Sequence, residues 1–296
     1  MKIAILDTRK AYLPEISAYI SYLEKNGITA VRIYKDILDN INKYDIIWKF
    51  TGVDFIGNNN GSVVHEYNSL TVGKLKWIKD TIKKQTNIKP EGRVFLNNEV
   101  KAAMNFKDNV PSIIRDMGIA KEFFVQNPNK EYDFVYIGAM EKSRQLDQIL
   151  HSFKQKDIQK NILMIGRPND ELYAQFKDNK NIIFTGIVNY KEVPKLASKG
   201  IYGLNYVPDV YPFNKQTSTK LLEYCALGLN IVTTDYYWVR NFEEKENSSF
   251  YKITNKTHLD FESIDKFNYK TADVMKYEWN TVLNQSGLIE FINQIR

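Results

Sequence analysis

The chain has 296 residues, of which 43% are hydrophobic and 26% charged, as is typical of soluble globular proteins. Its length allows one large or two ordinary domains, and no run of about 18 apolar residues predicts a membrane-spanning helix. The single cysteine, Cys225, excludes an internal disulfide and fits a cytoplasmic protein.

The net charge of +6 is concentrated in the first part of the chain. Residues 1–128 contain 19 Lys and Arg against 14 Asp and Glu, whereas residues 129–296 contain 22 against 21. A basic surface attracts anionic partners, so we expect a phosphate-bearing acceptor or an anionic membrane surface on that side. The hypothesis of nucleic-acid binding rests only on the isoelectric point of about 9.0, and no recognised basic–aromatic motif supports it.

Strands and helices are expected to alternate through the first half. The predicted strands are 2–6, 30–34, 45–50, 63–66 and 93–96, and the predicted helices are 14–26 and 69–85. A polar loop at 57–61 is expected before the strand 63–66. Such alternation indicates βαβ units in an α/β protein with a mostly parallel sheet. Ligands of such sheets bind beyond the carboxyl ends of the strands, where His65 and Glu66 are expected. The lysine-rich 69–85 segment is typical of an ordinary surface helix covering the sheet, and a basic amphipathic helix of this kind can also lie on an anionic membrane.

The second half repeats the alternation after a turn-rich segment at 125–129. Its predicted strands are 133–137, 161–165, 181–185, 201–206 and 229–234, and its predicted helices are 143–154, 190–199 and 277–295. The turn composition of 125–129 places a domain boundary there.

The most informative stretch runs from Ser218 to Asp235. Ser218 or Thr217 can cap a helix whose apolar stripe includes Leu221, Leu222 and Cys225; Gly228 ends it before the strand. Lys220 and Glu223 lie off that stripe. A base and an acid therefore stand near a helix N-terminus, which suits a phosphate because its free N–H groups carry partial positive charge.

This stretch, with Lys220, Glu223, Gly228 and Asp235 at their spacing, resembles the nucleotide-sugar site of GT-B-fold glycosyltransferases, in the retaining group numbered family 4. Further similar segments are Phe134–Gly138 with Ser143–Asp147, Ile162–Gly166, and Asn181–Gly186 with Val193–Leu196. The resemblance implies two Rossmann-like domains facing across a cleft. Residues 1–125 would bind the acceptor, residues 126–280 the nucleotide sugar, and a helix at 281–296 would pack back on the first domain.

The resemblance also implies roles for individual residues. Glu223 would hydrogen-bond the ribose, and Arg144, with Lys220 and Lys142, would hold the diphosphate. The nucleotide-sugar site would further include Gly138, Gly166, Ser218 and Thr219, and the catalytic candidates are His65 and Glu66. Two positions depart from the family pattern: Ala139 stands where the family has an arginine, and Lys215 where it often has a glutamate.

The resemblance implies a hexosyltransferase-type enzyme that uses a UDP- or GDP-sugar, needs no metal or other cofactor, and retains the anomeric configuration. The expected acceptor is a glycan or a polyprenyl-phosphate-linked glycan in cell-surface polysaccharide synthesis, with the protein in the cytoplasm or peripheral at the inner face of the membrane. Two alternatives remain open: a sugar-nucleotide epimerase of the same fold, and a non-catalytic partner subunit, which the departures at Ala139 and Lys215 make reasonable.

Overall fold

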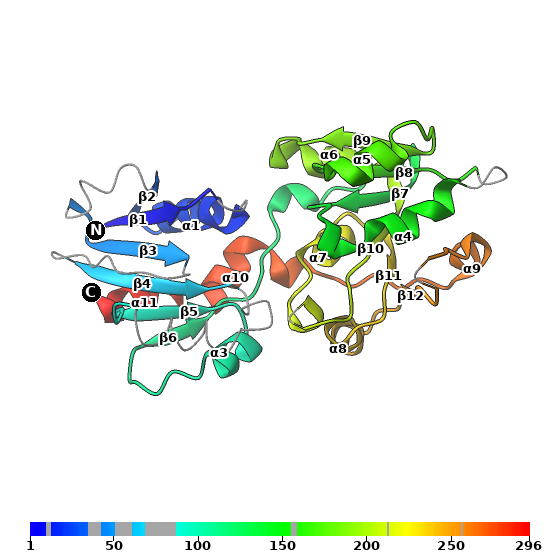
Figure 1. Ribbon diagram of the computed structural model, residues 1–296. Coiled ribbons are helices and arrows are strands. Elements are labelled where there is room, and N and C mark those ends of the chain that lie inside the picture. The colour runs from blue at the N-terminus through cyan, green and yellow to red at the C-terminus, as the bar shows by residue number, and fades with distance from the viewer. Residues whose placement is uncertain are drawn as a thin grey trace. The chain divides into compact units, whose positions relative to one another are not determined.

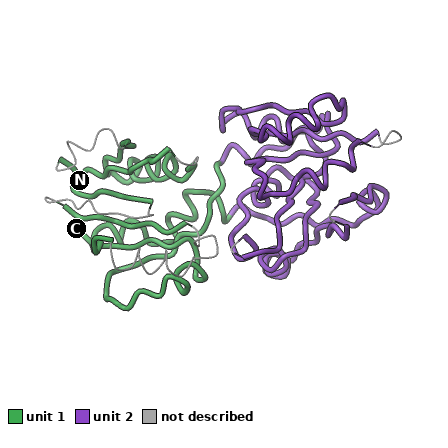
Figure 2. The backbone as a smooth tube through the Cα atoms, viewed as in Figure 1, with its two compact units in different colours: residues 1–120, 276–296 green, residues 121–275 purple. Residues whose placement is uncertain are grey.

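The structure is a computed structural model that describes residues 1–9, 13–34, 43–50, 61–68, 87–154, 159–211, 213–255 and 257–296. The chain forms two compact units, shown in Figures 1 and 2. Unit 1 contains Met1–Ala120 together with Lys276–Arg296, and unit 2 contains Lys121–Met275. The chain thus leaves unit 1 and later returns to it; the sequence places boundaries at 125/126 and 280/281.

Unit 1 is built on a parallel sheet with the strand order β2-β1-β3-β4-β5-β6 among the described residues. The strands are β1 (Lys2–Asp7), β2 (Thr29–Tyr34), β3 (Ile46–Phe50), β4 (Ser62–Tyr67), β5 (Gly92–Phe95) and β6 (Ser112–Ile114). The described helices of this unit are α1 (Pro14–Lys25), α3 (Asn98–Met104), α10 (Trp279–Gln285) and α11 (Leu288–Ile295).

Both faces of the unit 1 sheet are apolar, because successive side chains point to opposite faces and apolar residues occupy both sets of positions on β1. Ile3 and Ile5 pack in one cluster with Trp48 and with residues of α1, α10 and α11. Ala4 and Leu6, on the opposite face, belong to a separate cluster. The C-terminal helices therefore complete the core of the unit that contains the N-terminus, as Figure 1 shows.

Unit 2 contains a second parallel sheet, with the order β12-β11-β10-β7-β8-β9. Its strands are β7 (Tyr132–Ile137), β8 (Ile162–Ile165), β9 (Ile182–Gly186), β10 (Gly200–Asn205), β11 (Asn230–Thr233) and β12 (Tyr251–Lys252). The chain builds the sheet outward from β7 to β9 and then returns to place β10 on the other side of β7. This is the order of a doubly wound Rossmann sheet, whose switch point lies between β7 and β10.

Helices pack on both faces of the unit 2 sheet. The helices are α4 (Leu146–Leu150), α5 (Asp170–Phe176), α6 (Val193–Ala197), α7 (Thr219–Ala226), α8 (Tyr237–Glu246) and α9 (Phe261–Lys266). Residues of α4, α5 and α9 share one core cluster with Phe134 and Leu204 of the sheet. On α7, Tyr224 packs so closely over Gly203 that a Cβ there would lie 2.4 Å from its ring. Short 3₁₀ turns complete the chain: η2 (Lys121–Phe123), η3 (Lys142–Arg144), η4 (His151–Lys154), η5 (Tyr190–Glu192), η6 (Phe213–Lys215) and η7 (Met275–Tyr277).

The two parallel sheets with flanking helices confirm the predicted α/β class with two Rossmann-like units. Some predicted elements are wrong in detail. The single helix predicted over 143–154 is divided by Gln145, and the one over 277–295 by Gly287, because both residues have a left-handed backbone that a helix cannot contain. The sequence did not indicate the strands β6 and β12 or the helices α5, α8 and α9. Residues 57–60 of the predicted loop and the whole predicted helix 69–85 lie outside the described residues.

In the described part of the chain, no helix combines the length and the apolar composition that crossing a bilayer requires.

Candidate functional site

The helix α7 begins as the sequence predicts. Ser218 is its N-cap: the hydroxyl accepts a hydrogen bond from the backbone N–H of Leu221 at 3.4 Å and donates one to Oδ1 of Asn205 at 2.9 Å. Asn205 closes β10 and is fully buried. Its amide nitrogen donates to Thr233 and Tyr236, both at 2.9 Å. The start of α7 is thus fixed to the carboxyl ends of β10 and β11.

Tyr224 anchors the same helix at the switch point of the sheet. Its hydroxyl accepts from the backbone N–H of Ile137 at 2.8 Å and donates to the carbonyl of Leu204 at 3.4 Å. Ile137 ends β7 and Leu204 lies near the end of β10, so one side chain bridges the two strands where they separate. This places α7 at the position where doubly wound sheets bind their ligands.

Lys220 extends from the first turn of α7 to the end of β7. Its ammonium group donates to the hydroxyl of Tyr136 at 2.9 Å and lies 4.0 Å from the centre of that ring. The same nitrogen lies 3.9 Å from where a Cβ of Gly138 would be. Gly138 has a φ of +118°, and its carbonyl oxygen lies 2.4 Å from the Cβ position of Gly166, so neither site readily accepts a side chain. The cation therefore borders a backbone turn that a ligand can approach closely.

Arg144 supplies a second positive charge to this site. Its guanidinium lies 4.9 Å from the ring centre of Phe213, which belongs to the turn η6 before α7. Arg144 is close enough for its charge to help lower the pKa of Lys220. Two cations held beside a glycine turn and a helix N-terminus form an arrangement suited to a diphosphate.

Glu223 is buried, although it lies off the predicted apolar stripe of α7. Its Oε1 accepts a hydrogen bond from the hydroxyl of Tyr190 at 2.7 Å. Among the described residues, this carboxylate accepts no other hydrogen bond. One oxygen of the carboxylate is thus committed to Tyr190, and the other is left for a ligand.

Burial shifts the ionisation of both charged residues of α7 toward neutrality. Burial raises the pKa of Glu223 to about 7, against the opposing effects of the Tyr190 hydrogen bond and the Lys220 charge. Burial also lowers the pKa of Lys220 to about 7, helped by Arg144 and opposed by Glu223. An anion bound beside Lys220 would raise its pKa again, so the site gains positive charge when a phosphate arrives.

Comparison with known proteins identifies the family to which this chain belongs. A model described as glycosyl transferases group 1 matches residues 119–283, which is more than half of the chain. The chain belongs to the glycosyl transferases group 1 family. No curated protein sequence matched significantly.

Solved structures show that this glycosyltransferase has the GT-B fold. Anabaena HepE, crystallised in complex with UDP and glucose, aligns with a TM-score of 0.65 at 10% identity, covering 100% of this chain and 98% of HepE. Sucrose-phosphate synthase from Thermosynechococcus elongatus aligns with a TM-score of 0.69 at 10% identity, covering 98% of each chain. UDP-GlcNAc 2-epimerase from Methanocaldococcus jannaschii, in complex with UDP-GlcNAc and UDP, gives a TM-score of 0.58 at 14% identity over 99% of each chain.

The structure brings together most of the residues that the sequence assigns to the nucleotide-sugar site of this glycosyltransferase. Those that gather at the switch point of unit 2 are Gly138, Arg144, Gly166, Ser218, Thr219, Lys220 and Glu223. Lys142 instead pairs with Glu171 of α5 at 3.0 Å, and both side chains are largely exposed. Lys215 lies over the ring of Tyr237, 2.9 Å from its centre. In the described part of the chain, no group of three or more His, Cys, Asp or Glu is placed to hold a metal ion.

The two catalytic candidates of unit 1 lie inside the sheet. His65 is fully buried on β4, in register with Lys49 of β3 and Arg93 of β5. Glu66 is also buried, and its Oε2 accepts from the indole N–H of Trp48 at 2.6 Å. Its Oε1 is paired with the guanidinium of Arg115. An internal ion pair is what the structure shows for Glu66, and the role of His65 at the reacting centre stays a prediction.

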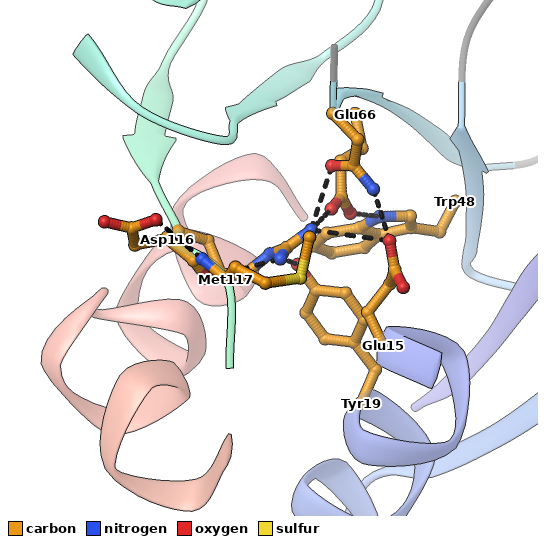
Figure 3. A network of polar contacts seen from close by, with 8 residues as sticks. Glu15, Tyr19, Trp48, Glu66, Asp116 and Met117 are labelled. Carbon is orange, nitrogen blue, oxygen red and sulfur yellow. Dashed lines mark hydrogen bonds and ion pairs between the residues drawn. The ribbon is translucent and has the colours of Figure 1, made fainter. Parts of the chain in front are cut away.

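Figure 3 shows Glu15, Tyr19 and Glu66 in one network of polar contacts. Arg115, which the sequence analysis did not single out, contacts all three. Its Nε donates to the hydroxyl of Tyr19 at 3.0 Å, and its Nη2 donates to Oδ1 of Asn68 at 2.9 Å and lies 4.0 Å from Oε1 of Glu15. The ring of Trp279 on α10 lies beside the Arg115 guanidinium, with its centre 5.3 Å from the guanidinium carbon. Burial alone would lower the pKa of Arg115, but the charges of Glu66, Tyr19 and Glu15 raise it above its ordinary value. One arginine therefore joins α1, β4 and α10.

Sequence reasoning also missed the aromatic partners of Lys220 and Glu223. Tyr136 stands two residues before Gly138 in a predicted strand, a position from which a side chain can reach a ligand at the strand end. That spacing could have indicated Tyr136 as a residue of the candidate site. Tyr190 gives no such signal, because its partner Glu223 is 33 residues away and the two meet only through the packing of the sheet.

Proposed function

We propose that this glycosyltransferase transfers a hexosyl group from a UDP- or GDP-sugar to a glycan or lipid-linked glycan, with retention of configuration, in cell-surface polysaccharide synthesis. The observation that carries the proposal is the placement of Lys220 and Glu223 one turn apart on the capped helix α7, at the switch point of unit 2, with Arg144 in electrostatic reach. The UDP complex of HepE, a chain of similar fold, supports a UDP-sugar as the first donor to test.

Each residue of this site has a distinct task in the proposed reaction. Glu223 accepts hydrogen bonds from the ribose hydroxyls and so fixes the nucleoside. Lys220 and Arg144 neutralise the diphosphate as it departs and takes up charge, and free N–H groups at the start of α7 add to that stabilisation. The leaving diphosphate accepts the proton of the attacking hydroxyl. We propose that these groups replace a metal ion in neutralising the charge.

Donor binding can be measured directly on the intact protein. At a concentration about 100 times its Kd, a nucleotide sugar is expected to stabilise the unit that binds it by about 2.7 kcal/mol, which corresponds to a rise in Tm of about 5 to 10 °C. A thermal-shift screen of UDP- and GDP-sugars checks this, with CMP-sugars as a comparison. Equal shifts for every nucleotide, or none for any, would overturn the proposed donor site.

An epimerase of similar fold is the second candidate, because the 2-epimerase also aligns along the whole chain. Incubation with a nucleotide sugar and no acceptor distinguishes the two. An epimerase interconverts the sugars, whereas a transferase releases the nucleoside diphosphate slowly by hydrolysis. Addition of a glycan or polyprenyl-phosphate-linked acceptor then accelerates release only for the transferase.

We propose that the acceptor is presented at an anionic membrane surface on the inner face, where the cytoplasmic protein binds peripherally through its basic first half. Residues 1–128 hold most of the net charge. The protein is expected to float with vesicles that contain anionic lipid and to be released as salt is raised, because added ions screen the attraction. Flotation with neutral vesicles is the control, and binding that is equal for both kinds of vesicle contradicts this part of the proposal.

A further inference from the structure

The contact between Tyr190 and Glu223 has a consequence for how the donor is held. Tyr190 begins the turn η5, whose cap residue Asn189 accepts a hydrogen bond from the backbone N–H of Lys191 at 3.1 Å. The ring of Tyr190 packs on that of Phe123, with the two centres 5.5 Å apart, and Phe123 is fully buried. The hydroxyl of Tyr190 is thus directed at Glu223 by a capped turn and by a core aromatic residue.

The two oxygens of the Glu223 carboxylate differ in their hydrogen bonds. Oε1 accepts the tyrosine hydroxyl at 2.7 Å, whereas Oε2 has no hydrogen-bond partner within the described ranges. A carboxylate held at one oxygen cannot rotate freely, so the second oxygen keeps a defined direction. A ribose offers two neighbouring hydroxyl donors, for which a fixed carboxylate oxygen is a suitable acceptor.

We propose that Tyr190 is a positioning residue of the donor site: its hydroxyl orients Glu223 and keeps that carboxylate ready to accept the ribose hydroxyls. The inference rests on the proposed function of the α7 site and adds a residue from a different element to it. Tyr190 acts on the nucleotide through Glu223, so its contribution disappears when the carboxylate is absent.

The charges around Glu223 give the proposal a pH signature. Lys220 on the same helix favours the ionised carboxylate, Arg144 acts on Lys220, and Tyr224 lies near enough for its ionisation to be affected by Glu223. The hydrogen bond from Tyr190 also lowers the pKa of Glu223, against the larger effect of burial. Loss of the hydroxyl therefore raises that pKa, and the pH needed to ionise the carboxylate rises with it.

The test is a double-mutant cycle on the full chain. Tyr190→Phe, Glu223→Gln and the double variant are titrated with UDP-glucose by calorimetry from about pH 5.5 to about pH 8.5. UDP-glucose is the probe because its diphosphate has no proton to lose in this range. Tyr190→Phe keeps the ring on Phe123 and is expected to weaken binding about 3- to 10-fold near pH 7, with the acidic limb of the profile moved to higher pH.

The outcomes separate this inference from the site on which it rests. In the Glu223→Gln background, Tyr190→Phe is expected to have no further effect and the acidic limb is expected to be absent. Tyr173→Phe, which removes the hydroxyl of a half-exposed tyrosine on α5, is the matched control and should bind as the parent protein does. If Glu223→Gln does not weaken binding, the proposed donor site fails. If it does, but Tyr190→Phe leaves affinity and pH profile unchanged, or acts equally in both backgrounds, only the role of Tyr190 is overturned.

Discussion

Replacement of Glu223 by alanine is expected to lower both the rate of sugar transfer and the affinity for the nucleotide sugar by about 10- to 150-fold. The lost contact is a charge-assisted hydrogen bond, which contributes ~1.5–3 kcal/mol. Arg144→Ala is expected to fall in the same range, because it removes one of two cations at the diphosphate. Initial rates with saturating acceptor, together with calorimetric titration of the donor, measure both effects.

A surface carboxylate provides the control for this experiment. Glu262 pairs with Lys266 one turn away on α9, and 78% of its side chain is exposed. Glu262→Ala removes a carboxylate from the same unit and is expected to leave rate and affinity unchanged. Full turnover and full donor affinity in Glu223→Ala would show that α7 does not hold the nucleotide.

Replacement of Arg115 by methionine is expected to destabilise unit 1 by about 3–5 kcal/mol, because it leaves buried carboxylates without their counter-charge. Glu15 and Glu66 are both buried, and the guanidinium of Arg115 is paired with Glu66 and lies 4.0 Å from Glu15. Urea unfolding measures the loss, and hydrogen exchange of peptides from β4 and α10 locates it in unit 1. Arg115→Met with Glu66→Gln is expected to recover part of the stability, because one uncompensated charge is removed.

The loss in Arg115→Met is expected to depend on pH with a defined sign. Burial already raises the pKa of Glu15 in the folded protein, although Arg115 opposes this shift. Without Arg115 the folded-state pKa of Glu15 rises further above the unfolded value. A raised carboxyl pKa stabilises at low pH and loses that effect as pH increases, so the variant should be less impaired near pH 5 than near pH 8.

A partly exposed arginine of the same unit is the comparison. Arg32 lies 3.6 Å from Asp7 and 29% of its side chain is exposed. Arg32→Met is expected to cost less than about 1 kcal/mol, because solvent replaces the lost interaction. If Arg115→Met costs no more than Arg32→Met, the buried network does not stabilise unit 1.

The sequence was most informative where the relevant interactions are local. The cap at Ser218, the apolar side of α7, and the spacing of Lys220 and Glu223 involve residues three or four positions apart, so a linear pattern reports them directly. The alternation of strands and helices is local in the same sense, and it predicted the class of both units. The predicted helices 143–154 and 277–295 are wrong at Gln145 and Gly287, where a left-handed backbone divides a helix that apolar spacing alone would continue.

By itself, then, the amino-acid sequence determined two α/β units and a capped helix bearing an acid and a base, because these follow from short-range spacing. Only the tertiary structure decided which partners those groups meet. Lys220 contacts Tyr136, 84 residues away in the sequence, and Glu223 contacts Tyr190, 33 residues away. Arg115 contacts Glu66, 49 residues away, so a residue predicted to be catalytic forms an internal ion pair. Such contacts depend on how strands are ordered and how side chains are buried, which spacing along the chain does not encode.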